Sequence, residues 1–150
     1  MTRSSQLPDA WDEAVRLLVR RDRSASEVRA ELALRGRPEA VVDAILARLV
    51  DLGYVDDKRL AADLAERLVE RQRGSLQVEA ALTARGFDPA AIAAAVANST
   101  LDEIDRARLL IASRFPEGLA EPRTRARAAR FLHGRGFPEA AVLAIIGEDW

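Results

Sequence analysis

Arginine side chains are the groups in this 150-residue chain best suited to bind a charged partner. Arginine supplies 22 of the 23 basic residues, and Lys58 is the only lysine. A guanidinium is planar and carries several donors, which suits bidentate contact with a carboxylate or a phosphate. Because 24 acidic residues nearly cancel the basic ones, any cationic surface must be local.

Three of the arginines recur at a fixed interval. Arg23, Arg73 and Arg123 stand fifty residues apart, each at the entrance to a segment with the pattern of a helix. In a stack of similar units, equivalent positions line one surface, and solenoid proteins build extended binding faces in this way. We therefore predict a face that binds a partner or DNA and consists of these arginines and their neighbours: Arg16, Arg20, Arg23, Arg67, Arg71, Arg73, Arg123, Arg127 and Arg130.

The last third of the chain is locally basic. From Arg106 to Arg135 there are eight arginines, and the acidic residues are Glu117 and Glu121. The arginines at positions 123, 127 and 130 have the spacing that places them on one side of a helix. Such a face can bind phosphates or an acidic protein surface. The alternative interpretation is a charged face that contacts only solvent.

The usual catalytic and metal-binding arrangements are missing from the sequence. His133 is the only histidine and there is no cysteine, so a nucleophile with its base cannot be assembled in the common ways. Asp56 and Asp57 are neighbours in sequence, and neighbours do not face each other on a helix. Lys58 follows no glycine-rich phosphate loop. We expect a binding protein with no cofactor and no metal site, and not an enzyme.

A short motif occurs three times and indicates how the arginines are positioned. The segment Leu82–Phe87 has counterparts at 32–37 and 132–137, each with an Arg-Gly pair. Glycine just past a helix end adopts the left-handed conformation, and the residue after it packs on the residue three positions inside that end. A proline follows each glycine closely, as proline does in the first turn of a helix. The motif therefore predicts a helix, a sharp corner and a second helix, three times over.

The apolar pattern predicts an all-α fold. Helical spacing recurs throughout, and no segment alternates as a strand does. We expect three tandem three-helix repeats that form an elongated, curved solenoid, with boundaries at 9–55, 56–99 and 100–150 after a mobile segment at 1–8. Asp9 is expected to cap the first helix, and Ser24 with Glu27 forms a capping box for the second. A longer loop at 116–122 should precede a helix that starts at Thr124.

The sequence also indicates where in the cell the protein is expected. No apolar run approaches the length of a membrane span, and Met1–Pro8 lacks the apolar core of a signal peptide. We expect a cytoplasmic monomer without a membrane partner.

Three motifs, in order, carry a family resemblance. They are Arg23-Ser24-x-x-Glu27-Val28-x-x-x-Leu32-x-x-Arg35-Gly36, then Leu52-Gly53-Tyr54-Val55-Asp56-Asp57 with Leu60-Ala61, then Gly74-x-x-x-Val78-x-x-x-Leu82-x-x-Arg85-Gly86-Phe87. In this order and spacing the chain, from about Trp11 to its C-terminus, resembles the RecX family of RecA regulators. Two features depart from the family pattern: Leu60 replaces an aromatic residue, and Glu66, Leu68 and Glu70 dilute the basic run before Gly74.

The resemblance implies a crescent of three-helix repeats that binds RecA and lodges in the groove of the RecA–DNA filament. It also implies inhibition of ATP hydrolysis, strand exchange and cofactor activity in SOS repressor cleavage. Two other binding functions stay open. One is a free-standing helical protein that binds DNA or RNA, although Myb-like repeats carry regularly spaced tryptophans and this chain has only Trp11 and Trp150. The other is a helical scaffold for a different acidic partner.

Overall fold

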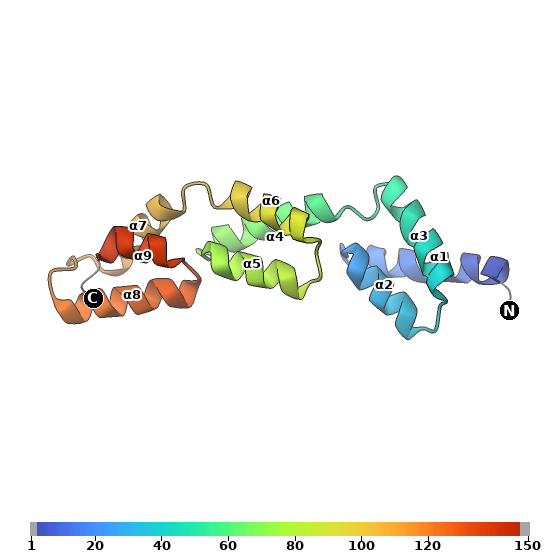
Figure 1. Ribbon diagram of the computed structural model, residues 1–150, viewed down its shortest axis with the longest axis horizontal. Coiled ribbons are helices and arrows are strands. Elements are labelled where there is room, and N and C mark those ends of the chain that lie inside the picture. Colours follow the sequence, from blue (N-terminus) through green and yellow to red (C-terminus); the bar gives the residue numbers. More distant parts are fainter. Residues whose placement is uncertain (1–2, 148–150) are drawn as a thin grey trace.

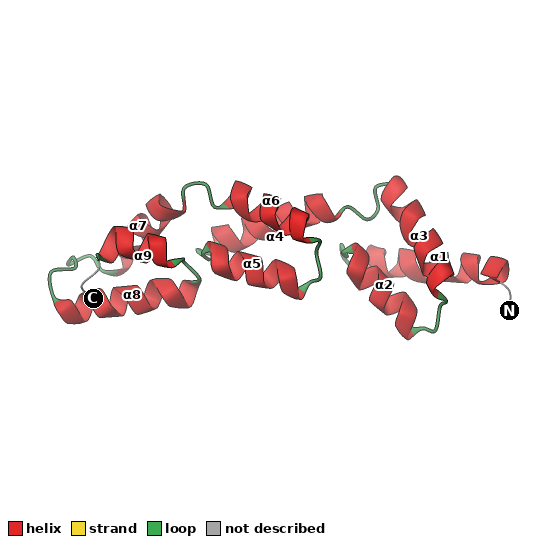
Figure 2. Cartoon of the chain, in the orientation of Figure 1, coloured by secondary structure: helices red, strands yellow, loops and turns green. Residues whose placement is uncertain are grey.

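The computed structural model describes residues 3–147, and every regular element in that range is a helix (Figure 1, Figure 2). The all-α prediction is therefore confirmed. The helices are α1 (Arg3–Arg20), α2 (Ala25–Leu34), α3 (Glu39–Asp51), α4 (Asp57–Glu70), α5 (Ser75–Ala84), α6 (Pro89–Ser99), α7 (Glu103–Arg114), α8 (Pro122–Arg135) and α9 (Glu139–Ile146).

The helices form three units of three, which lie in a row along the long axis of the molecule (Figure 1). Unit 1 is α1–α3, unit 2 is α4–α6 and unit 3 is α7–α9. Extensive helix packing occurs within units, for example between α4 and α6 or between α1 and α3. Each unit has its own buried apolar cluster, centred on Leu32 and Leu49, on Val78 and Leu82, and on Leu132. The elongated solenoid is thus a row of small cores with limited contact between them.

The three Arg-Gly corners have the predicted geometry. Gly36, Gly86 and Gly136 have φ angles of 78°, 76° and 90°, in the left-handed region. At the third corner the Phe137 N–H donates to the carbonyl of Leu132 at 3.0 Å, and the other two corners form the same bond. Phe137 is only 1% exposed, so the corner is fixed by packing as well as by hydrogen bonds.

The predicted start of the first helix is wrong. Helix α1 begins at Arg3, so residues 3–8 belong to it and do not form a separate lead-in segment. Asp9 therefore lies inside the helix and does not cap it. Pro8 lies in the second turn of α1, where its missing N–H removes one backbone hydrogen bond and its ring crowds the carbonyl four residues earlier. Met1 and Thr2, also part of the predicted mobile segment, lie outside the described residues.

Unit 3 has a longer middle helix than the other two. The sequence predicted a start at Thr124, but α8 starts at Pro122 and has 14 residues, whereas α2 and α5 have 10 each. Proline at the first position favours this start because its ring already has a helical φ angle. The capping box at Ser24 is confirmed, since its side chain accepts the Glu27 N–H at 3.1 Å and the Glu27 carboxylate accepts the Ser24 N–H at 2.9 Å.

Candidate partner-binding surface

The predicted face divides into exposed and half-buried arginines. The half-buried ones are Arg23 and Arg73. The exposed ones come from α1, from the end of α4 and from α8, and they are Arg16, Arg20, Arg67, Arg71, Arg123, Arg127 and Arg130. These exposed arginines are therefore available to a partner. Whether the nine act together as one binding face stays a prediction.

The fifty-residue interval does not give three equivalent positions. Arg23 and Arg73 immediately precede Ser24 and Gly74, the N-caps of α2 and α5. Arg123 instead lies within the first turn of α8, after the cap. The reason is the early start of α8, which shifts the helix entrance relative to the sequence interval. The equivalence predicted for Arg123 is wrong, although its side chain is exposed.

Arg23 and Arg73 lie where neighbouring units meet. The Nε atom of Arg23 is buried and has no hydrogen-bond partner. The Nη1 atom of Arg73 donates to the Gln77 side chain at 3.2 Å, and the carbonyl of Arg73 accepts from Arg106 at 3.4 Å. The Gln77 side chain in turn donates to the carbonyl of Gly134 in unit 3, so the Arg73 side chain touches this contact between units only through Gln77.

The first joint, between unit 1 and unit 2, is built largely from side chains. The Arg85 guanidinium donates to the Glu27 carboxylate at 2.6 Å, and the Ser24 hydroxyl donates to the Arg85 carbonyl at 3.1 Å. The Ala25 N–H donates to the Asp57 carboxylate at 2.8 Å. The N-terminal end of α2 is thus held by the Arg-Gly corner and the first helix of the next unit.

The negative charge of Glu27 forms part of the ion pair that holds this joint. Burial raises the pKa of Glu27, but hydrogen bonds from Arg85 and from the Ser24 backbone outweigh burial, so the pKa lies below its ordinary value. Side chains of Glu27 and Arg85 are 22% and 24% exposed, so water screens the pair only in part. The carboxylate is therefore ionised in the folded protein at neutral pH.

The second joint, between unit 2 and unit 3, is built largely from backbone. The N–H groups of Gly74 and Leu76 donate to the carbonyls of Arg135 and Gly136 at 2.8 and 2.9 Å. The Ser75 N–H donates to the Glu103 carboxylate at 2.6 Å. A Cβ atom on Gly74 would collide with the Gly136 backbone. Glycine is therefore required at position 74 by the close approach of two backbone segments.

Sequence reasoning missed the roles of Arg85 and Arg135. Both were assigned to structural corners, and the structure shows that these corners receive the neighbouring unit. A signal was present, because the Arg-Gly pair recurs even where the aromatic residue after it does not. That this pair receives the neighbouring unit could be inferred only by knowing which helix end lies against which corner.

Unit 3 also carries a stack of arginines and aromatic rings. The rings of Phe115 and Phe131 meet edge to face, with centroids 6.2 Å apart. The guanidinium carbons of Arg114 and Arg135 lie 5.5 and 5.4 Å from the Phe131 centroid. That of Arg127 lies 5.6 Å from the Phe115 centroid. We call these five residues the arginine–phenylalanine ladder. The two rings form its centre, with Arg114 and Arg135 on Phe131 and Arg127 on Phe115.

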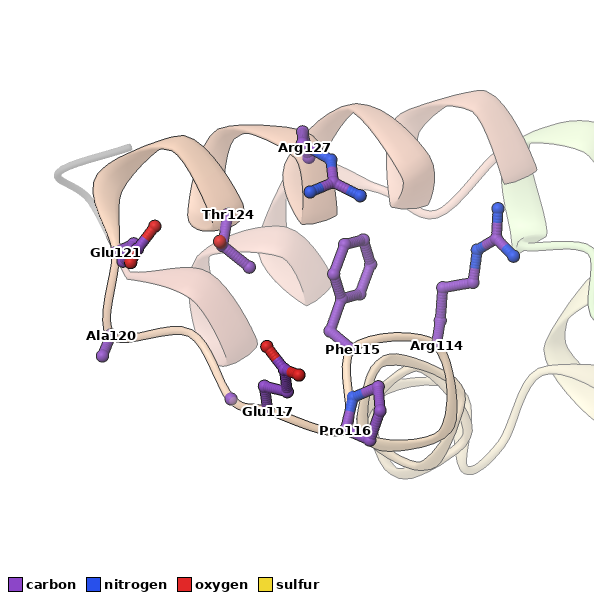
Figure 3. Close-up of a pocket in the computed structure, with 9 residues that line it drawn as sticks. Arg114, Phe115, Pro116, Glu117, Ala120, Glu121, Thr124 and Arg127 are labelled. Carbon is purple, nitrogen blue, oxygen red and sulfur yellow. The ribbon is translucent and has the colours of Figure 1, made fainter.

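One end of the ladder borders an open cavity of about 380 Å³ at the loop between α7 and α8. Figure 3 shows the guanidinium of Arg127 beside the ring of Phe115, with the carboxylate of Glu117 facing the same cavity. Glu121 and Thr124 complete its far wall. The cavity thus has a cationic side and an acidic side, whereas the rest of the ladder is cationic.

Comparisons with known proteins identify the family. The family description "RecX, first three-helix domain" matches residues 10–49. "Regulatory protein RecX" of Chromohalobacter salexigens is 33% identical over 98% of this chain and 97% of that protein. The chain belongs to the RecX family. A second RecX-family relative, from Stenotrophomonas maltophilia, is 38% identical over 83% of this chain and 77% of its own length.

Solved RecX structures share the fold. A crystal structure of RecX from Lactobacillus salivarius has a TM-score of 0.82 at 19% identity, and covers 95% of this chain and 96% of its own. A second crystal structure, of regulatory protein RecX, has a TM-score of 0.78 at 21% identity over 97% of this chain and 75% of its own. The row of three-helix units is therefore an architecture that this RecX-family chain shares with solved RecX proteins.

Two further features bear on what the surface can bind. Among the described residues 3–147, no group of histidines and carboxylates has the arrangement of a metal site. In the same range, none of the helices combines the length and apolar character needed to cross a membrane.

Proposed function

We propose that this RecX-family chain binds RecA and the RecA–DNA filament, and that it mainly inhibits filament ATP hydrolysis, strand exchange and SOS coprotease activity. The observation that carries the proposal is similarity to named regulatory proteins over nearly the whole chain. In this proposal the chain has no catalytic activity of its own, needs no cofactor, and acts as a monomer in the cytoplasm, where RecA works.

The shape and charge of the molecule support this role. An elongated row of units can follow a groove between protein subunits, and its exposed arginines can contact acidic side chains there or the nucleic-acid backbone. In the proposal, Arg16, Arg20, Arg67 and Arg71 contact the partner from the first two units, and Arg123, Arg127 and Arg130 do so from α8. Arg23 and Arg73 are half-buried and contribute less to this contact than the exposed arginines.

The experiment that tests the proposal adds the chain to preformed RecA–DNA filaments and follows ATP hydrolysis. We expect the rate to fall as the chain is added. The variant Arg123→Glu/Arg127→Glu/Arg130→Glu should inhibit at least tenfold less well, since reversed charges repel an anionic partner. The matched control is Arg35→Glu/Arg48→Glu/Arg59→Glu, which changes three exposed arginines outside the predicted face. If the wild-type chain leaves the rate unchanged, the proposed function is wrong. If both variants inhibit equally, the face is wrong.

The second candidate function is direct binding of nucleic acid without RecA. The arginine–phenylalanine ladder is the observation that favours it. The two functions are compatible, because a protein that lies in a filament groove can contact DNA there.

A further inference from the structure

We infer that the arginine–phenylalanine ladder of unit 3 is the part of this chain that contacts the sugar–phosphate backbone of single-stranded nucleic acid. The inference deepens the proposed function and relies on it only in naming DNA as the polymer. It assigns a ligand to one unit, and it includes Arg114 and Arg135, which the predicted face of nine arginines omits.

The rings hold the guanidiniums without using their donors. A cation over an aromatic face is attracted by the ring quadrupole, and this attraction uses none of the cation's hydrogen-bond donors. In the ladder, Phe131 contacts two guanidiniums and Phe115 contacts a third. The N–H groups at the guanidinium edges therefore stay available to an anion, while the rings limit the movement of the side chains. Less conformational entropy is then lost when a phosphate binds.

The ladder arginines also lack the carboxylate partners that other arginines have. Arg29 pairs with Asp43 at 2.8 Å, and Arg37 pairs with Glu13 at 2.7 Å. The ion pairs found among residues 3–147 include none made by the three ladder arginines: Arg114, Arg127 and Arg135. Arg114 and Arg127 are exposed, and Arg135 donates weakly to the Arg71 carbonyl at 3.5 Å. The ladder is therefore a row of cations whose charge is not neutralised by a neighbouring carboxylate in an ion pair.

The surroundings extend this row in both directions. At one end, the contact of Arg135 with the backbone of Arg71 brings the ladder to the exposed end of α4. At the other end, Arg123 and Arg130 add exposed charges on α8. The carboxylates of Glu117 and Glu121 lie on the cavity side. Arg114 and Arg127 also line that cavity, so a polyanion would contact Arg135, Arg114 and Arg127 on the side of these guanidiniums that faces away from those carboxylates.

Phosphates fit this surface better than an acidic protein does. Protein interfaces gain most of their energy from a few tryptophan, tyrosine and arginine side chains that are buried in well-packed pockets. Here guanidiniums already cover both rings, so the ladder offers charge and hydrogen-bond donors and few apolar anchors. A single strand presents phosphates at regular intervals, and its bases can stack on the outer faces of guanidinium planes. The observations favour the nucleic acid.

The test measures binding of fluorescent oligo(dT) to the full chain by anisotropy, without RecA, at several salt concentrations. We expect the double variant Arg114→Gln/Arg127→Gln to bind about tenfold more weakly, and its log–log salt slope to fall by about 1.4, because each phosphate contact on a single strand contributes roughly 0.7. The matched control is Arg48→Gln/Arg59→Gln, which has the same net charge. Arg48 is also stacked, on Trp11 at 5.3 Å, but lies in unit 1. The control should bind within twofold of wild type.

Three results would overturn the inference: no binding of oligo(dT) by the wild-type chain, equal loss in the two double variants, or equal competition by poly-glutamate and by unlabelled oligo(dT). Circular dichroism confirms that both variants are folded. The proposed function has a separate readout. If the chain binds oligo(dT) but has no effect on the RecA filament, the proposed function is wrong and the inference about the ladder stands. If the chain inhibits the filament but does not bind oligo(dT), the inference is wrong and the proposed function stands.

Discussion

The two joints hold similar units together by different means. In the first joint, a charged side chain of one unit meets a charged side chain of the next, Arg85 with Glu27. In the second joint, Gly74 lies against Gly136 so closely that backbone groups bond directly. Both use the same parts, a helix N-terminus docked on an Arg-Gly corner. The ion pair of the first joint depends on solution conditions, whereas the close approach of Gly74 to Gly136 in the second depends on shape. We therefore expect the two joints to respond differently to substitution and to pH.

The largest expected effect is from Gly74→Ala. The added Cβ would collide with the Gly136 backbone, and overpacking of this kind costs about 1–3 kcal/mol. The φ angle of Gly74 is −85°, so backbone strain does not contribute. Denaturant unfolding should show this loss, and hydrogen exchange should rise at the N–H groups of Gly74 and Leu76. The equivalent residue in the first joint, Ser24, already carries a Cβ. Unchanged stability in Gly74→Ala would show that the second joint is not close-packed in solution.

A smaller effect is expected from Arg85→Ala. The substitution removes the 2.6 Å hydrogen bond to the partly buried Glu27 carboxylate and leaves only the weaker ion pair with Arg21 at 3.7 Å, which costs about 1–2 kcal/mol, near the lower end for a hydrogen bond to a charged group. A double-mutant cycle with Glu27→Gln isolates the pair. We expect a coupling of at least 0.5 kcal/mol for residues in direct contact. If the effects of the two substitutions simply add, the ion pair does not fasten the first joint.

The smallest expected effect is the change that Glu27→Gln makes in the pH dependence of folding stability. Because folding lowers the pKa of Glu27, its stabilising contribution is complete above the ordinary pKa of 4.5 and is lost as pH falls through the lower pKa of the folded state. The denaturant midpoints of wild type and Glu27→Gln should therefore differ at pH 6 and converge in acid. Glu13, whose pKa is lowered mainly by its hydrogen bond from Arg37, gives the same dependence within unit 1. The pH-dependent contribution of Glu13 to stability is still present in Glu27→Gln. A constant difference between wild type and variant at every pH would contradict the charged nature of the first joint.

The parts of the fold that local sequence determines were predictable. A glycine cap, a capping box and an apolar stripe each depend on residues within one or two turns, so the corners and the all-helical class could be inferred. The start of α8 was not, because Pro116 to Pro122 had the composition of a loop and Pro122 proved to be the first residue of the helix. The start of α1 at Arg3 was not predictable either, because Pro8 lies in its second turn, where proline normally disfavours a helix.

The candidate site was harder to predict because it depends on residues far apart in the chain. Arginine counts indicated that unit 3 is basic, but not that Phe115 and Phe131 would meet and order three of the guanidiniums. The joints likewise join residues about sixty positions apart, such as Ser24 and Arg85. A regular sequence interval was a good indicator of repeated architecture. It was a poor indicator of equivalent surface positions, as Arg123 shows.

The most direct test of the central claim is sedimentation of labelled chain with preformed RecA–DNA filaments at physiological salt. The proposal predicts saturable co-sedimentation, weakened by Arg123→Glu/Arg127→Glu/Arg130→Glu and kept by Arg35→Glu/Arg48→Glu/Arg59→Glu. Free DNA at the same concentration should retain less of the chain. If the wild-type chain stays in the supernatant with the filaments, or sediments equally with free DNA, the proposal that it acts on the RecA filament is wrong.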